Sequence, residues 1–228
     1  MAQRRRRASL PGAPPRAAPF RCRLVVMAKA PLAGAAKRRL AAEIGSTEAI
    51  RFARAAISAL MSRVGRDRRW QTILAVSPDR FADSPIWPAK SKICAQGPGD
   101  LGQRMQRLCQ ATAPGPLVIV GTDIPNLTAQ HIARAFRLLG NRDAVFGPAL
   151  DGGYWLVGLR RRPRLPRPFR AVRWSSPHAL SDTLANLSDH RIGFLGTLGD
   201  VDSAEDWRRS APGAGRRLLP GPLRFGAR

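Results

Sequence analysis

The sequence is poor in cysteine, histidine, tyrosine and lysine, and it has no long hydrophobic run. Its three cysteines and three histidines are scattered, with no Cys-x-x-Cys pair, which argues against the usual zinc and redox motifs. No apolar stretch approaches the length of a transmembrane helix. The prolines that follow Arg4–Arg7 interrupt any signal-peptide core, so we expect a cytoplasmic protein without a membrane span. The oligomeric state stays open.

Positive charge is concentrated at the two ends of the chain. Residues 1–23 carry seven arginines and residues 208–228 carry six, whereas all 15 acidic residues lie between these ends. Both ends are also rich in proline, glycine and alanine, so we expect disordered tails at 1–23 and 210–228 around one domain at 24–209. The interior shows no recognition helix, RNP-type strand or basic patch with interleaved aromatics. A non-catalytic nucleic-acid-binding protein is therefore only a third hypothesis, and no specific nucleic-acid partner is expected.

Strand and helix patterns alternate along the interior, which predicts an α/β fold. Ser46 and Thr128 are expected to cap helices, and a further helix is expected over 100–111. The closer strand spacing in the second half favours a sheet that is parallel at first and then gains antiparallel strands. Arg160–Arg170 contains three prolines and is expected to be an exposed loop. Strands are expected at 24–28, 72–76, 92–95, 117–121, 144–146, 154–159 and 192–195.

The most informative segment is Val118–Pro125, where an apolar run ends abruptly in Asp123 and then a proline. This pattern places a carboxylate at the carboxyl end of a buried strand, where open α/β sheets bind their ligands. Such a carboxylate suits a hard cation such as Mg²⁺ or Mn²⁺, which in turn holds phosphates. An Asp-x-Pro sequence also favours turns, so a turn aspartate remains the alternative reading.

The first expected strand runs directly into a loop of small residues that spans Lys29–Arg39 and includes Gly34 and Lys37. Backbone N–H groups of such a loop, with its basic side chains and the following helix N-terminus, can bind an anionic group. The spacing matches neither a Walker loop nor a dinucleotide fingerprint. A basic surface turn is the alternative, because the chain is rich in arginine.

Two later segments add polar candidates. Asp151-Gly152-Gly153 lies between two expected strands, and it reads either as a plain turn or as a place where the backbone approaches a ligand. Asp202 precedes a helix-start pattern that accounts for the neighbouring acids but not for Asp202 itself, so it is a second candidate metal ligand. Trp174 reads equally as a buried anchor or as the wall of an acceptor pocket.

The order of these motifs resembles a bacterial family described as glycosyltransferase-like, also called the radical-SAM/selenodomain-associated transferase 1 group. The matching motifs are M-A-K-A-P, K-x-R-L, G-T-D-x-P-x-L, G-P-A-x-D-G-G-Y and D-V-D-x-x-E-D. The resemblance runs from about Leu24 to Trp207 and includes two smaller matches, Leu101–Met105 and Val172–Ser175. One departure is Arg38, which stands where the family usually has threonine.

The resemblance implies a single-domain, GT-A-like (Rossmann-like) α/β fold of the nucleotide-diphospho-sugar transferase superfamily. A mixed, mainly parallel sheet would carry helices on both faces. The implied enzyme is a metal-dependent transferase with a nucleotide-activated donor, in the first instance a glycosyltransferase that transfers a sugar from a nucleotide sugar to a small acceptor. The alternative is a nucleotidyltransferase that releases pyrophosphate, because the opening motif also resembles the 2-phospholactate guanylyltransferases.

The resemblance also suggests roles for individual residues. Asp151 is the candidate catalytic residue. The ion is expected to be Mg²⁺ or Mn²⁺, with Asp123 and Asp202 as its ligands. The expected donor-phosphate residues are Lys29, Gly34, Lys37 and Arg39, and the expected acceptor or sugar residues are Asp151, Gly152, Gly153 and Trp174.

Overall fold

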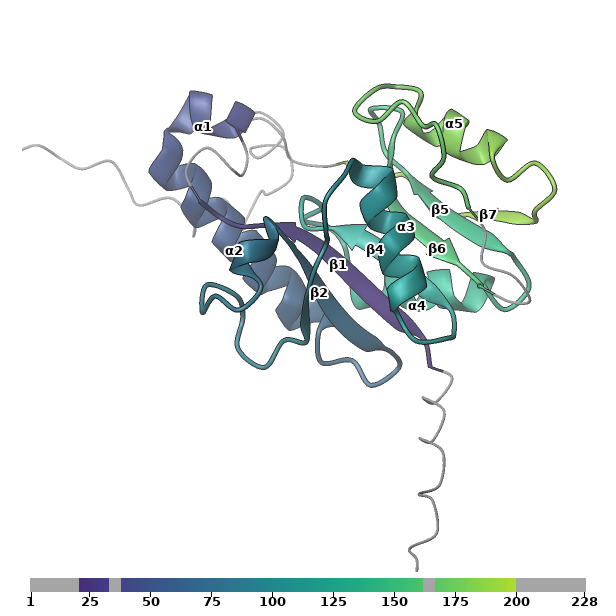
Figure 1. The fold of residues 1–228 in the computed structure, drawn as a ribbon, viewed down its shortest axis with the longest axis horizontal. Coiled ribbons are helices and arrows are strands. Elements are labelled where there is room, and N and C mark those ends of the chain that lie inside the picture. Colours follow the sequence, from purple (N-terminus) through teal and green to yellow (C-terminus); the bar gives the residue numbers. More distant parts are fainter. Residues whose placement is uncertain (1–20, 33–37, 162–166, 200–228) are drawn as a thin grey trace, which may run out of the picture.

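The computed structural model describes residues 21–32, 38–161 and 167–199, and its strands form one mixed sheet (Figure 1). The strands are β1 (Arg23–Lys29), β2 (Gln71–Ser77), β3 (Ile93–Ala95), β4 (Leu117–Gly121), β5 (Ala144–Pro148), β6 (Tyr154–Leu159) and β7 (Ile192–Phe194). Their order across the seven-stranded sheet is β3-β2-β1-β4-β6-β5-β7. The sequence therefore predicted each of these strands to within about two residues.

The sheet is mainly parallel, with one described strand reversed. β1 pairs in parallel with β2 and β4, and β2 pairs in parallel with β3. β6 lies antiparallel between β4 and β5, while β7 is again parallel to β5. The sequence predicted antiparallel strands in the second half, and among the described strands β6 is the antiparallel one. The carboxyl ends of the parallel strands meet at one edge, which we call the carboxyl edge.

Helices cover both faces of this sheet, as the sequence predicted. Apolar side chains of α2 and α4 pack on one face, the α2 face, and those of α3 and α5 pack on the other, the α3 face. Figure 1 shows α3 in front of the sheet and α4 behind it. The helices are α1 (Arg38–Ile44), α2 (Ser46–Val64), α3 (Leu101–Ala111), α4 (Ala129–Leu138) and α5 (Ala179–Ala185), with a short 3₁₀ helix, η1, at Asp79–Phe81.

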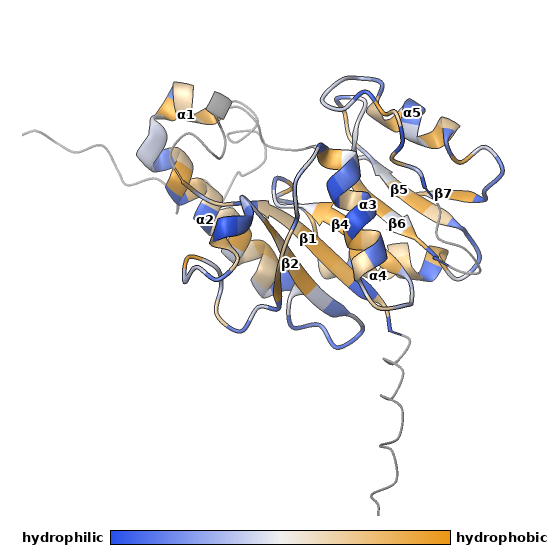
Figure 2. Ribbon diagram, viewed as in Figure 1, coloured by the Kyte–Doolittle hydropathy of each residue, from blue (hydrophilic) through white to orange (hydrophobic). Residues whose placement is uncertain are grey.

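The central strands are apolar on both sides because helices bury both faces of the sheet. Along β1, Val25 contacts the α3-face core and Val26 contacts the α2-face core, and both are fully buried. Figure 2 shows β1 and β2 coloured mainly as hydrophobic, whereas many of the loops around them are hydrophilic. Tyr154 and Trp155 follow this alternation too, since each packs against a different face of the core. Packing on the core therefore accounts for both rings.

The predicted cap at Thr128 is confirmed, and the helix expected from Asp100 begins one residue later, with Asp100 as its cap. Thr128 caps α4 by accepting a hydrogen bond from the backbone N–H of His131, and Asp100 caps α3 through Gln103 in the same way. The prediction for Ser46 is wrong: Ser46 is the first residue of α2, and Gly45 precedes it without a side-chain cap. Gly45 has a φ of 87°, a conformation that glycine adopts without steric cost.

The expectation of an exposed loop from Arg160 is wrong at Arg161. This side chain is half-buried and donates hydrogen bonds to several backbone carbonyl groups of residues 109–115. Arginine can be drawn into a surface depression in this way because its fork of five N–H donors satisfies several carbonyl groups at once. Across the described ranges, no helix combines the length and hydropathy needed to cross a membrane.

Candidate functional site

The sheet places several polar candidates at its carboxyl edge. Met27 of β1 is level with Gly121 of β4, and Lys29 is level with Ser77 of β2. Asp123 follows two residues after the end of β4, just beyond the last β1–β4 pair. The chain order reverses direction between β1 and β4, and such a switch point is where open α/β sheets form a ligand crevice.

Strand alternation also assigns a face to these residues. Val25 and Met27 pack on the α3 face, so Lys29 continues that row. Ile119 and Ala75 lie on the same face, which puts Gly121 and Ser77 there as well. Lys29 is exposed, and Ser77 is almost completely buried. At the carboxyl edge, the α3 face therefore carries the ammonium group of Lys29, the hydroxyl of Ser77 and Gly121 on three adjacent strands.

Gly121 opens space at this position. A Cβ atom placed on Gly121 would meet no atom of the described protein within 4 Å, so the glycine is not required by close packing against another protein segment. A glycine at a strand end next to open space lets a ligand approach the backbone closely.

Asp123 is half-buried just beyond this open space. The hydroxyl of Thr122 donates a long hydrogen bond of 3.4 Å to its carboxylate. Magnesium in nucleotide sites is usually bound by one or two carboxylates, with water and substrate phosphates completing the octahedron. The donor set at Asp123 fits that chemistry, although the described residues contain no group of three or more His, Cys, Asp or Glu side chains that could hold a metal ion by themselves.

Arg104, near the start of α3, is a site residue that sequence reasoning missed. Its guanidinium donates to the hydroxyl oxygen of Ser77 over 3.0 Å and to the carbonyl oxygen of Gly99 over 2.9 Å. These two bonds fix a half-buried positive charge at the carboxyl end of β2, on the same face as Lys29. The match at Leu101–Met105 drew attention to the segment, but only the fold shows that Arg104 reaches the strand ends.

The loop before α3 is rigidly tied to the sheet. Gln96 is 4% exposed, and its side-chain amide donates to the carbonyl oxygens of Ala28 and Ala75, which belong to β1 and β2. Arg107 in turn donates to the carbonyl oxygen of Gln96 over 2.8 Å. One buried amide therefore joins the carboxyl ends of β1 and β2, and Arg107 joins the same loop to α3.

The Asp151-Gly152-Gly153 segment is the turn between β5 and β6. The exposed Asp151 accepts a hydrogen bond of 2.9 Å from the backbone N–H of Gly153. Gly152 has a φ of 83°, and a Cβ there would come within 2.3 Å of the carbonyl oxygen of Pro177. Turn geometry and close packing therefore account for both residues. A role of this turn in acceptor binding stays a prediction.

Trp174 belongs to a cluster of aromatic side chains beneath the start of α3. Its ring lies 6.4 Å from that of Tyr154 and 6.3 Å from that of Phe169. A Cβ on Gly102 would lie 2.7 Å from the Trp174 ring, so the helix start rests directly on this residue. Burial raises the pKa of Tyr154, which keeps its hydroxyl neutral within the cluster. Trp174 thus supports α3, and a contact with the acceptor stays a prediction.

Four of the predicted site residues lie outside what the structure describes. They are Gly34, Lys37, the side chain of Arg39, and Asp202. Lys29, Asp123 and the turn at Asp151 are described, and all three follow strand ends at the carboxyl edge. Leu198 bridges Ala149 in parallel beside this turn.

The sequence matches a family model over residues 60–176, more than half of the chain. The model is described as "uncharacterized protein conserved in bacteria (DUF2064)". The chain belongs to this family. The matched region begins within α2 and includes β4, Asp123, the turn at Asp151 and Trp174. No curated protein matches the sequence.

Solved structures share the fold. A candidate nucleotide-diphospho-sugar transferase from Desulfovibrio desulfuricans is 24% identical, with a TM-score of 0.75 over 87% of this chain and 94% of the other. A 4-diphosphocytidyl-2C-methyl-D-erythritol synthase from Anaerococcus prevotii is 10% identical, with a TM-score of 0.55 over 84% and 94%. A CMP:2-keto-3-deoxy-manno-octonic acid synthetase, solved with CTP, is 10% identical, with a TM-score of 0.55 over 86% and 99%. At these identities the likeness establishes the mainly parallel α/β fold.

Proposed function

We propose that this protein is a metal-dependent transferase that uses a nucleotide-activated donor, in the first instance a glycosyltransferase acting on a small acceptor. The observation that carries the proposal is the arrangement at the carboxyl edge. Lys29, Gly121 and Asp123 follow adjacent strands at the topological switch point, next to open space. A cation, an acid and room for a ligand at this place suit a nucleotide diphosphate with a bound metal ion.

Each charged group has a defined part in this proposal. Lys29 and Arg104 bind donor phosphates from the α3 face, together with Gly34, Lys37 and Arg39 of the loop that follows β1. Asp123 holds Mg²⁺ or Mn²⁺, with Asp202 as its second carboxylate. When bound, the ion stabilises negative charge on the leaving phosphate oxygens. The protein's own contribution is a fixed set of donors, because Ser77 and Gly99 already orient Arg104.

The acceptor is proposed to bind beside the β5–β6 turn. Asp151, Gly152 and Gly153 are on this turn, and Trp174 supports the neighbouring start of α3. Asp151 is exposed and is the candidate base for the acceptor hydroxyl. We place the protein in the cytoplasm, where nucleotide donors are available.

Nucleotidyl transfer is the second candidate. Two of the solved structures with this fold are named as a diphosphocytidyl and a CMP synthase, one of them solved with CTP. In this reaction an acceptor oxygen attacks the α-phosphorus of a nucleoside triphosphate, and pyrophosphate leaves. The same Lys29, Arg104 and Asp123 arrangement would serve it.

A thermal-shift screen of nucleoside triphosphates and nucleotide sugars, each with and without Mn²⁺, identifies the donor. A ligand that binds only the folded state raises the melting temperature. Product analysis then separates the two reactions, since glycosyl transfer releases a nucleoside diphosphate and nucleotidyl transfer releases pyrophosphate. Failure of every nucleotide to stabilise the protein at millimolar concentration would overturn the proposal.

A further inference from the structure

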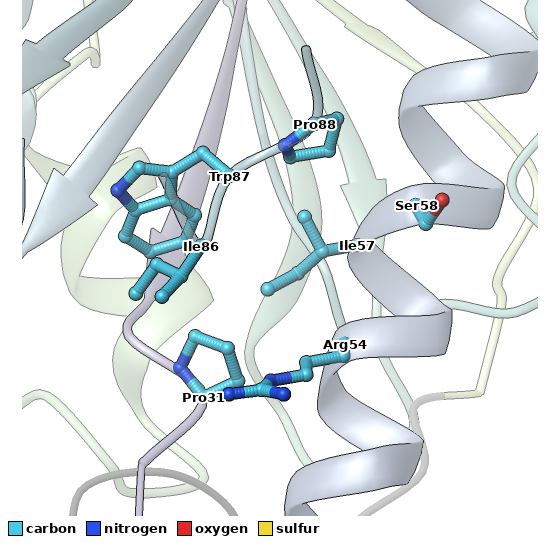
Figure 3. Close-up of a pocket in the computed structure, with 7 residues that line it drawn as sticks. All are labelled: Pro31, Arg54, Ile57, Ser58, Ile86, Trp87 and Pro88. Atoms are coloured by element: carbon cyan, nitrogen blue, oxygen red, sulfur yellow. The ribbon is translucent and has the colours of Figure 1, made fainter. Parts of the chain in front are cut away.

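A surface pocket of about 190 Å³ lies on the α2 face (Figure 3). Its apolar wall combines the chain just after β1, the loop after η1 and one side of α2. Ile57 and Trp87, two of its members, belong to the buried core of that face. The apolar lining residues are Pro31, Ile57, Ile86, Trp87 and Pro88, and α2 adds Arg54 and Ser58.

The size of the cavity restricts what it can hold. Cavities of about 150 Å³ lined by aliphatic and aromatic side chains bind a single benzene ring, whereas drug-sized ligands need roughly 300 Å³ or more. At about 190 Å³ the pocket accommodates one ring or one short branched chain. The rigid prolines at 31 and 88 and the buried indole of Trp87 give it fixed walls.

The charge at this cavity is supplied by Arg54. Figure 3 shows its side chain reaching from α2 toward Pro31, so the guanidinium lies at the cavity. Arg54 forms no hydrogen bond or ion pair with any residue in the described ranges, in contrast to Arg51 one turn earlier, which pairs with Glu48 at 2.8 Å. A guanidinium without a carboxylate partner beside an apolar cavity complements a ligand with an apolar body and a negative end.

We propose that this cavity binds a small organic anion whose body is a single ring or a short branched chain, with Arg54 neutralising its charge. The site goes beyond the proposed transferase function and does not depend on it. Ile57 and Trp87 place it on the opposite face of the sheet from Lys29, Gly121 and Arg104.

Three probes that separate the apolar body from the charge test the proposal on the full chain, with isotope-labelled isoleucine methyl groups as reporters. Benzoate carries body and charge, benzamide carries the body alone, and acetate carries the charge alone. Benzoate should shift the methyl signals of Ile57 and Ile86 but not that of Ile132, which lies on α4. Benzamide should bind at least about tenfold more weakly, the change that 1.4 kcal/mol produces, and acetate should not saturate these shifts. Equal binding of benzoate and acetate would overturn the proposal.

Two variants locate the charge and the cavity. Arg54→Gln should reduce benzoate affinity about tenfold, to the level of benzamide, whereas the matched Arg51→Gln on the same helix should leave it unchanged. Ile86→Trp should fill the cavity and abolish the binding of both ring probes. Equal losses in Arg54→Gln and Arg51→Gln would show a diffuse basic surface and refute the proposal.

A competition experiment separates this site from the transferase site. A nucleotide found in the thermal-shift screen, or GTP with Mn²⁺ if none is found, should not displace benzoate. Displacement would contradict the assignment of the cavity as a separate site. Benzoate binding without any nucleotide binding would support the cavity while refuting the transferase proposal, so the two failures are distinguishable.

Discussion

Two arginines at opposite ends of the strands differ in their hydrogen-bond partners. At the amino edge, where β1 and β4 begin, Arg161 donates hydrogen bonds to the carbonyl oxygens of Cys109, Thr112, Ala113 and Gly115 at 2.7–3.0 Å. At the carboxyl edge, Arg104 donates to the carbonyl oxygen of Gly99 and to the hydroxyl of Ser77, which ends β2 level with Lys29 of β1. The first arginine closes a loop, and the second supplies charge beside open space.

This contrast explains why net charge says little about function here. A guanidinium whose donors all meet carbonyl groups is part of the protein's framework, since its removal leaves those acceptors without partners. A guanidinium held by two bonds beside open space has donors that a phosphate can use. Counting arginines treats both alike, whereas their partners distinguish them.

The strongest test of the comparison is Arg161→Ala. Four backbone carbonyl groups lose a charged donor, so the free energy of unfolding should fall by about 3 kcal/mol. Nucleotide affinity, measured below the melting transition, should be unchanged. Urea unfolding of Arg161→Ala beside the exposed control Arg170→Ala checks this, and an equal stability loss in both variants would erase the contrast between the edges.

The open space at the carboxyl edge can be filled at Gly121. Because a Cβ there meets no atom of the described residues within 4 Å, Gly121→Leu should fold with little loss of stability and should exclude the donor. We expect nucleotide affinity to fall at least about hundredfold, or about 2.7 kcal/mol, and Gly121→Ala to have a much smaller effect. Calorimetric titration of the two variants provides the measurement. Undiminished binding by Gly121→Leu would mean that the donor lies elsewhere.

Arg104→Gln provides the counterpart to Arg161→Ala. Loss of one charge-assisted phosphate contact should weaken nucleotide binding by about 2 kcal/mol, while the melting temperature changes little. The control Arg66→Gln removes one exposed positive charge after α2 and should not affect binding. A stability loss in Arg104→Gln comparable to that of Arg161→Ala, with affinity intact, would place Arg104 among the framework arginines.

The smallest effect concerns the pair between Arg173 and Asp182, next to Trp174. Two guanidinium bonds at 2.8 and 2.9 Å and the backbone N–H of Arg173 hold the pKa of Asp182 well below its usual range. The pair therefore stabilises the fold above the unfolded-state pKa of aspartate, and this contribution disappears as the pH falls through the lowered value. The stability difference between the native protein and Asp182→Asn should be constant from pH 7 to about 5 and should shrink below about pH 4. A difference that persists unchanged to pH 2 would show that the carboxylate charge is irrelevant.

Much of the fold follows from local sequence signals. Local patterns indicate β1 and β4 through their apolar runs, and they indicate two helix starts through the capping residues Asp100 and Thr128. Both signals are local because burial and backbone capping depend on a few neighbouring positions. The sequence also placed Asp123 after a buried strand, and the structure confirms that position.

Other features depend on contacts between distant parts of the chain. The insertion of β6 between β4 and β5 is a matter of strand pairing, which no local pattern encodes. Arg104 and Arg161 are each one arginine in an arginine-rich sequence, and only tertiary hydrogen bonds to Ser77 and to residues 109–115 distinguish them. The support of α3 by Trp174 likewise joins segments about 70 residues apart, Gly102 and Trp174.

The central claim is that Asp123 holds the metal ion that binds the donor phosphates. Calorimetric titration of Asp123→Asn with nucleotide, with and without Mn²⁺, tests it most directly, because asparagine keeps the size and capping ability of aspartate. Asp202→Asn should act in the same direction but more weakly. We expect Asp123→Asn to keep the fold and to lose the Mn²⁺-dependent part of nucleotide affinity. Unchanged Mn²⁺-dependent affinity would contradict the account and leave Asp123 as a turn residue.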